Sequence, residues 1–210
     1  MIKAVLSMDK INRYIAAQCG KPQGIIGVLI TTMQNIVNAA MYRKAVSLVN
    51  VSANDKVLDI GYGNGHLLKM IYRKSHADLY GIDISDDAKA MALRRNTEAR
   101  KAGKLHLRIG DCCNLPDRDE LFSAVTSINT IYFWSDTLKG LTEIRRTLKT
   151  GKSFYNILYT KDYLDKVQYT QTGFKKFEPK QLASLGKQAG FRKVSVKRIS
   201  KNAFAVIYTK

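Results

Sequence analysis

The feature that most constrains the fold is a short apolar run ending in three alternating glycines, KVLDIGYGNG at residues 56–65. Its apolar side chains, Val57, Leu58 and Ile60, predict a strand that is buried on both faces. The next residues, HLLKMIYRKS at 66–75, repeat apolar side chains at helical spacing. In a strand–glycine turn–helix unit, the backbone amides at the helix N-terminus point toward the turn, where they can bind an anionic or polar group of a ligand.

The spacing of the glycines separates two classes of nucleotide ligand. A dinucleotide fingerprint has glycines at its first, third and sixth positions, whereas here Gly61, Gly63 and Gly65 take the first, third and fifth, and His66 the sixth. This spacing disfavours a nicotinamide oxidoreductase. Asp59 precedes the first glycine by two residues, and the D-x-G-x-G-x-G string resembles motif I of the class I S-adenosylmethionine (SAM) methyltransferases. The resemblance implies that Asp59 and the three glycines hold the methionine end of SAM.

A second strand is predicted at 78–84, DLYGIDI, and it carries Asp83 at its tip. An acid at this place can accept hydrogen bonds from both ribose hydroxyls, in SAM and in NAD alike. We expect Ile84 to contact the cofactor beside it. The alternative role, capping the next helix, is already filled by Ser85. That helix is predicted to run without interruption over 86–102.

An acid also follows the third predicted strand, LHLRIG at 105–110. In the methyltransferase family the acid at this place bonds the adenine amino group, and the backbone of the next residue flanks the ring. Asp111 and Cys112 match these two positions, so the resemblance implies that they bind adenine. The alternative is that Asp111 only forms the turn before Pro116.

The three cysteines, Cys19, Cys112 and Cys113, show neither a metal-ligand spacing nor a disulfide framework. We therefore predict no metal, and a reduced, cytoplasmic protein. The chain has no run of 18 apolar residues, so no membrane span is expected, and its N-terminal apolar run is too short for a signal peptide.

The fourth strand, predicted at 122–130, should end beside the first, where the change in strand order opens a crevice. Asn129 is expected to contact the cofactor there. Three aromatic residues follow, Tyr132, Phe133 and Trp134, and they are predicted to line the substrate pocket. The alternative is that this aromatic cluster belongs to the core.

The string N-T-I-Y-F-W-S-D at 129–136 resembles the small-molecule "type 11" subgroup of these methyltransferases. It differs from the N-P-P-Y type of string found in enzymes that methylate exocyclic amines of nucleobases. A general base is needed only if the acceptor is protonated. Tyr132 and His66 are the candidates, but His66 also fits the surface of its helix, and no catalytic base is assigned.

The N-terminal segment is predicted to be helical, with residues 24–49 forming one or two helices. Its string KPQG-x-x-G, ending in M-Q-N-x-x-N, resembles a segment that covers the SAM and substrate pocket in the same subgroup. Asn35 and Asn38 match that segment and are expected in the pocket wall, although an exposed position would also suit them. We expect a helical lid over 1–50 and a SAM-binding domain over 51–210.

The chain ends in two alternating strands, FRKVSVKRIS at 191–200 and AFAVIYTK at 203–210. A terminal antiparallel hairpin is unlike an NAD-binding fold. The expected fold is therefore α/β and Rossmann-like, with a seven-stranded, mostly parallel sheet, an antiparallel last strand and helices on both faces.

The formal net charge is +18, with 13 Lys or Arg against 3 Asp or Glu in residues 151–210. Such a surface attracts RNA, an anionic membrane or an acidic substrate, or is simply solvated. The favoured hypothesis is SAM-dependent methyl transfer to a small-molecule acceptor, with S-adenosyl-L-homocysteine as the product. The alternatives are an RNA methyltransferase and a non-catalytic SAM-binding module. The acceptor atom (carbon, nitrogen, oxygen, sulfur or arsenic) and the oligomeric state stay open.

Overall fold

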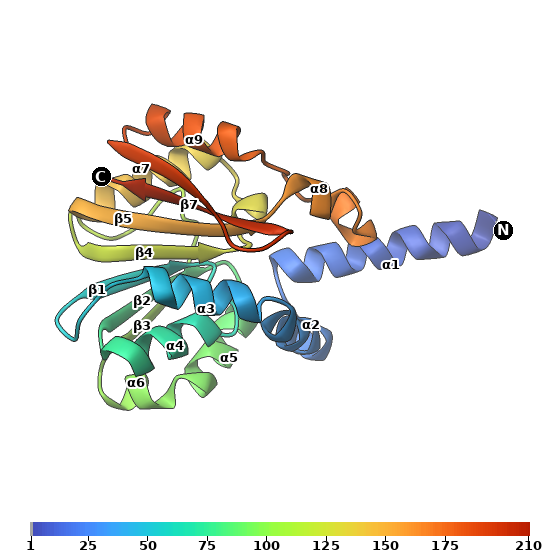
Figure 1. Ribbon diagram of the computed structural model, residues 1–210. Helices are drawn as coiled ribbons and strands as arrows, with labels where there is room; N and C mark the ends of the chain where they lie inside the picture. The colour runs from blue at the N-terminus through green and yellow to red at the C-terminus, as the bar shows by residue number, and fades with distance from the viewer. Residues whose placement is uncertain (1) are drawn as a thin grey trace.

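A single mixed sheet of seven strands forms the centre of the molecule (Figure 1). The computed structural model describes residues 2–210, with side chains from residue 8 onward. The strands are β1 Lys56–Ile60, β2 Asp78–Asp83, β3 Leu105–Ile109, β4 Phe122–Ile128, β5 Leu148–Tyr159, β6 Lys193–Arg198 and β7 Ala203–Thr209. Their order is β3-β2-β1-β4-β5-β7-β6, and only β7 runs antiparallel to its neighbours. The predicted seven-stranded Rossmann-like sheet, with its antiparallel last strand, is confirmed.

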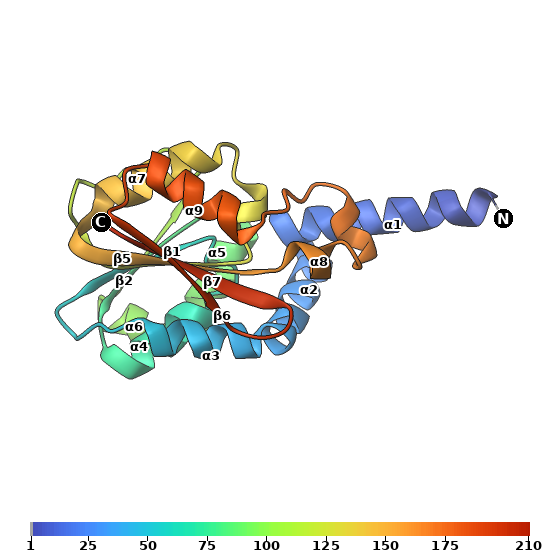
Figure 2. The same cartoon turned by 45° about the horizontal axis from the view of Figure 1, so that its top comes forward.

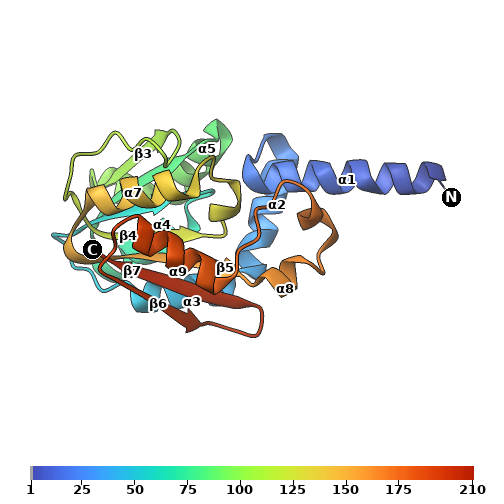
Figure 3. The ribbon, with the colours of Figure 1, turned by 90° about the horizontal axis from the view of Figure 1, so that it is seen from above.

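Helices cover both faces of this sheet (Figures 1 and 3). One face packs against α3, α4 and α5, and the other against α7 and α9. The helices are α1 Ile2–Gly20, α2 Gly24–Val37, α3 Ala39–Leu48, α4 His66–Ser75, α5 Asp86–Arg95, α6 Thr97–Lys101, α7 Thr137–Thr147, α8 Lys161–Leu164 and α9 Pro179–Gln188, with single 3₁₀ turns at Ile131–Phe133 and Gln168–Gln171.

Strand β1 lies at the centre of the core, as its apolar run predicts. Val57 is fully buried in the cluster beneath α3 and α4, and Leu58 and Ile60 are buried in the cluster beneath α7 and α9. Because successive strand side chains point to opposite faces, a strand covered on both sides needs apolar residues at both kinds of position. Asp59, an acidic residue within this strand, is also buried.

The helix expected without interruption over 86–102 is instead divided into α5 and α6 at Asn96. The side chain of Asn96 donates to the carbonyl oxygens of Ala92, at 2.9 Å, and Gly65, at 3.0 Å. An asparagine that bonds nearby backbone competes with helical hydrogen bonding, so a tertiary contact with the glycine turn accounts for the break.

The N-terminal segment forms three helices. Helix α3 packs on one face of the sheet, against β4 and β5. Helix α1 projects away from the body (Figures 1 and 2), and α2 contacts both α1 and α3. The two helices within 24–49 agree with the expectation for that segment. Among residues 2–210, no single helix is both long and apolar enough to cross a membrane, but α2 and α3, bent by 66°, pass that test of length and composition as a pair.

Candidate active site

A cavity of about 660 Å³ lies at the carboxyl ends of the central parallel strands, and side chains of α2 form part of its wall. This volume falls within the ~300–1,000 Å³ typical of small-molecule sites. Residues from four strand ends and from α2 line it. They include Asp59, Gly61 and Gly63 after or within β1, Asp83 and Ile84 at β2, Asp111 and Cys112 after β3, Asn129 and Thr130 after β4, and Asn35 and Asn38 from the N-terminal segment.

The glycine turn after β1 has a backbone that other residues rarely adopt. Gly61, Gly63 and Gly65 have φ values of 68°, 51° and 72°. A Cβ at Gly61 would lie 2.4 Å from the Thr130 side chain, so a larger residue does not fit there. A Cβ at Gly63 would meet no protein atom within 4 Å. Since Gly63 lines the cavity, its missing side chain leaves open space where a ligand can approach the backbone.

The side chain of Asn96 stabilises this glycine turn. It is 2% exposed, and its hydrogen bond to the carbonyl of Gly65 connects α5 to the loop. A Cβ at Gly65 would lie 2.5 Å from the Asn96 amide. The sequence pattern does not single out Asn96, because an asparagine within a helical stretch is usually an exposed polar residue.

Asp59 is the most deeply buried acid of the site. Its carboxylate accepts a hydrogen bond from the Thr126 hydroxyl at 2.8 Å. Burial raises the pKa of Asp59 to about 7; the Thr126 bond opposes this shift, and the charge of Asp83 adds to it. Near neutral pH, Asp59 is therefore poised between its neutral and charged forms.

Asp83 connects the ends of the first two strands. Its carboxylate accepts hydrogen bonds from the backbone amides of Gly63 at 2.9 Å and Ser85 at 3.0 Å. Burial raises the pKa of Asp83, and those amides oppose the shift. Ser85 caps α5 by accepting from the amide of Ala88 at 3.2 Å, as predicted. Each carboxylate oxygen keeps a lone pair for a further donor, while Ile84, 43% exposed, lies beside it.

Asp111 follows β3, the strand next to β2, and also lines the cavity. Its carboxylate accepts from the Cys113 amide at 2.9 Å and from the Ser135 hydroxyl at 2.7 Å. Burial raises its pKa, but these two bonds outweigh that effect and hold the pKa of Asp111 below its usual value. The side chain is consequently a charged acceptor that is open to solvent and to a ligand.

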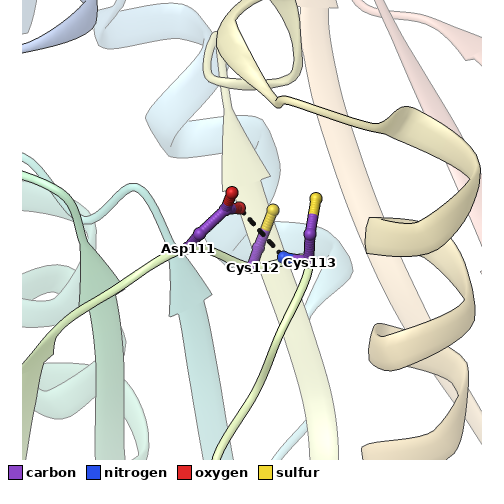
Figure 4. A group of neighbouring side chains, drawn as sticks. All are labelled: Asp111, Cys112 and Cys113. Atoms are coloured by element: carbon purple, nitrogen blue, oxygen red, sulfur yellow. Dashed lines mark hydrogen bonds between the residues drawn. The ribbon is translucent and has the colours of Figure 1, made fainter.

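The side chains of the consecutive residues Asp111, Cys112 and Cys113 lie side by side (Figure 4). One donor atom from each lies within 4.8 Å of the others, a grouping that could hold a metal ion. The thiol of Cys113 contacts the carbonyl of Asp136 at 3.1 Å, and burial raises the pKa of Cys112 well above its ordinary value. Metal ligation requires thiolates, and burial disfavours the thiolate of Cys112, so a role as a wall beside Asp111 fits these side chains better.

A network of polar side chains joins the N-terminal segment to the ends of β4 and β5. Asn129 donates to the side-chain oxygen of Asn38 at 3.2 Å and accepts from the Tyr132 phenol at 3.1 Å. Tyr159 donates to the same Asn38 oxygen at 2.7 Å, and its backbone amide donates to Tyr132 at 2.7 Å. Asn129 adopts φ 58°. Tyr159 was not among the predicted site residues, since in sequence it is one more apolar strand position.

The remaining predicted pocket residues also lie at the cavity. Trp134 is 5% exposed and donates from its indole nitrogen to Thr130 at 3.2 Å. The ring of Phe133 packs edge to face on Phe174, with centroids 4.7 Å apart. Phe133, Trp134 and the half-buried Asn35 all line the cavity. The aromatic cluster therefore serves the core and the pocket at once.

Two of the predicted site residues, Gly65 and His66, do not line the cavity. His66 lies outside the cavity, where its ring contacts Tyr42 and its Nδ1 lies 3.3 Å from Arg95. Burial, Arg95 and Lys69 lower its pKa. Tyr62, in the glycine turn, does line the cavity, and its ring packs against the sheet over Gly81.

Residues 58–156 match the model of a methyltransferase domain family. The chain is 28% identical over 115 residues to the uncharacterized methyltransferase YdaC of Bacillus subtilis, covering 54% of this chain and 61% of that protein. It is 25% identical over 206 residues to the demethylmenaquinone methyltransferase of Lactiplantibacillus plantarum, covering 82% and 87%. The chain spans about half the length of several other curated relatives it matches.

Solved structures share the fold. The chain superposes with a TM-score of 0.68 on the phosphoethanolamine N-methyltransferase 2 of Haemonchus contortus, which was crystallised with phosphomonomethylethanolamine and S-adenosylhomocysteine. The two are 18% identical, and the match covers 84% of this chain and 52% of the other. At this identity the comparison establishes the arrangement of helices and strands only. The ligands of this chain have to be inferred from its own residues.

Proposed function

Because this chain belongs to the class I, Rossmann-like SAM-dependent methyltransferase family, of which residues 58–156 form the matched domain, we propose that it methylates a small-molecule acceptor. The observation that carries the proposal is that residues from separate strand ends meet at one cavity. The glycine turn, Asp83 and Asp111 come from three strand ends, and they line this cavity together with the aromatic residues after β4.

The residues of the cavity suit an adenosyl cofactor. Gly63 leaves backbone open to the cavity, Asp83 keeps lone pairs for two hydroxyl groups, and the charged Asp111 can accept from an exocyclic amine. Cys112, buried beside Asp111, has a small side chain that leaves room for an aromatic ring in the cavity. We assign Asp59, Gly61 and Gly63 to the methionine end, with Gly65 shaping the turn that presents them. We assign Asp83 and Ile84 to the ribose, Asp111 and Cys112 to the adenine, and Asn129 to the place between cofactor and acceptor.

When bound, this cofactor supplies a methyl group on a positively charged sulfur, which an acceptor takes by in-line displacement as the carbon–sulfur bond breaks. The chain's own task is then to align the acceptor and exclude water. Asn35, Asn38, Tyr132, Phe133 and Trp134 are the residues we assign to that task. Their aromatic rings favour a flat, largely apolar acceptor, a class that includes the demethylated quinone named for the relative in L. plantarum.

Tyr132 acts in this proposal by positioning rather than as a base. Its phenol donates to Asn129 and accepts from the Tyr159 amide, and burial raises its pKa. The hydrogen bond from the Tyr159 amide lowers the pKa, but burial outweighs it, so the phenol stays neutral and cannot readily take a proton. With His66 outside the cavity, the acceptor has to arrive with an available electron pair.

We also propose that the N-terminal helices cover the acceptor end of the cavity as a lid. Cavity-lining side chains of α2 and the Asn38 hydrogen bonds support this role. Neither RNA methylation nor a purely regulatory role gains support from a particular contact.

The test is incubation with isotopically labelled SAM and a metabolite extract, followed by mass analysis of the methylated products. We expect label in a small aromatic or quinone-like compound. Label that appears only in added RNA, or in no compound despite measured cofactor binding, would contradict the proposed acceptor class.

A further inference from the structure

The outward face of α2 presents an apolar stripe that no part of the described chain covers. Ile25, Leu29 and Ile36 lie along it at helical spacing and are 88%, 60% and 78% exposed. None of the three lines the cavity, which is reached by other residues of the same helix such as Ile30 and Asn35. Helix α2 therefore presents one apolar face to the cavity and a second apolar face to solvent. An exposed apolar face of this kind marks a surface that binds a partner or a membrane.

The polar groups on this stripe are already satisfied. Thr32 shares the face, and its hydroxyl donates to the carbonyl of Val28 at 2.7 Å. The sequence holds no charged residue from 22 to 42. An apolar surrounding would therefore cost this face little desolvation energy.

Positive charge borders the uncharged stretch on both sides. Lys21 precedes it and Arg43 and Lys44 follow it, and α1 adds Lys10 and Arg13. In the part of the chain described with side chains, none of these five cations forms an ion pair. Two acids lie in the same region, Asp9 in α1 and Asp87, whose carboxylate accepts from the amide of Gly24 at 2.8 Å. The five cations outnumber them, and with the chain's net charge of +18 the surroundings of α2 are complementary to an anionic surface.

We propose that the outward stripe of α2 docks on an anionic lipid bilayer, with Ile25, Leu29 and Ile36 inserted at the interface and Lys21, Arg43 and Lys44 beside the headgroups. An apolar helix face flanked by cations binds such membranes by apolar burial and by attraction to anionic lipids. A second copy of the chain fits this face less well, since pairing two stripes would bring the same cations together. The end formed by α1 and α2 lies on the side of the molecule away from the C-terminus (Figures 1 and 3). This docking does not depend on the proposed methyl transfer.

The experiment is co-sedimentation of the full chain with vesicles of phosphatidylcholine alone or mixed with phosphatidylglycerol. We expect binding to the mixed vesicles, weaker binding to phosphatidylcholine, and a decrease with added salt. Leu29→Glu should weaken binding to the mixed vesicles by about tenfold or more. Val196→Glu is the matched control, because it adds the same charge at an exposed apolar position on β6, and it should bind like the wild type.

A second measurement reports the insertion itself. Ile36→Trp places an indole on the stripe, and its fluorescence should shift to shorter wavelength with the mixed vesicles. The proposal is overturned if the wild type does not sediment with these vesicles, or if both Glu variants lose binding equally. It is also overturned if the stripe mediates dimerisation that Leu29→Glu abolishes, with no vesicle binding.

Discussion

The side-chain oxygen of Asn38 accepts a hydrogen bond from the phenol of Tyr159 at 2.7 Å, across 121 positions of the chain. The same oxygen accepts from Asn129. Asn38 lies where α2 meets α3 and is 7% exposed, so these bonds fix the N-terminal segment to the rim of the sheet beside the cavity. Leaving the buried side-chain amide of Asn38 without a hydrogen-bond partner would cost free energy, so this arrangement of the N-terminal segment is favoured over ones that break the bonds.

Tyr159→Phe removes one of these bonds and keeps the ring. We expect it to lower the free energy of unfolding by about 1 kcal/mol and to increase amide hydrogen exchange in α2. A double-mutant cycle with Asn38→Ala measures the contact itself. A coupling of roughly 0.5–1.5 kcal/mol is expected, and strictly additive effects would show that the pair does not interact.

Gly63→Ala tests the open space in the glycine turn. Its φ of 51° should make alanine cost about 1 kcal/mol of stability. The added methyl group would also enter the cavity, so binding of S-adenosylhomocysteine should weaken by about tenfold or more. Gly103→Ala provides the control, since Gly103 has φ 69° and an equally open Cβ position but does not line the cavity. Equal cofactor binding in the two variants would remove Gly63 from the site.

Asp59 gives stability a defined pH dependence. Its pKa rises from 3.8 to about 7 in the folded chain, so between these values the folded state holds a proton that the unfolded state has lost. Stability contributed by this group is present below about pH 4 and is lost as the pH rises to about 7. Asp59→Asn removes the ionisation and should melt a few degrees above the wild type at pH 8, since ~1 kcal/mol corresponds to roughly 2–4 °C.

The difference in melting temperature should shrink steadily as the pH falls from 7 to 4. Thermal unfolding of both proteins across this range measures it. A constant difference would mean that Asp59 titrates alike in the folded and unfolded chain, contrary to its complete burial.

Local patterns were sufficient to predict much of the fold and several cavity residues. The apolar run of β1 and the glycines after it are local signals, because each can be recognised from neighbouring residues alone. The acids at the strand ends can be recognised in the same way. They are predicted to share a site because the carboxyl ends of parallel strands meet at one edge of the sheet. The position of Asp83 followed from its strand alone, and Ser85 as the helix cap followed from its residue type.

Contacts between distant segments, and the backbone geometry of one tight turn, account for what the sequence did not reveal. Asn96 divides a helix because Gly65 lies beside it, and Tyr159 reaches Asn38 only after the sheet has formed. The grouping of Cys112 and Cys113 with Asp111 follows from a tight turn after β3, which spacing rules for metal ligands do not describe. In each case the partner is far away in sequence or depends on local backbone geometry that periodicity does not record.

The most direct test of the central claim is calorimetric titration of the wild-type chain, Asp83→Asn and Asp86→Asn with S-adenosylhomocysteine. Asp83→Asn keeps the shape of the side chain and removes the charge that would hold the ribose, whereas Asp86 is exposed in the first turn of α5. We predict saturable binding by the wild type, affinity reduced by about tenfold or more in Asp83→Asn, and unchanged affinity in Asp86→Asn. No heat of binding in the wild type, or equal affinity in all three proteins, would contradict the assignment of this cavity to the cofactor.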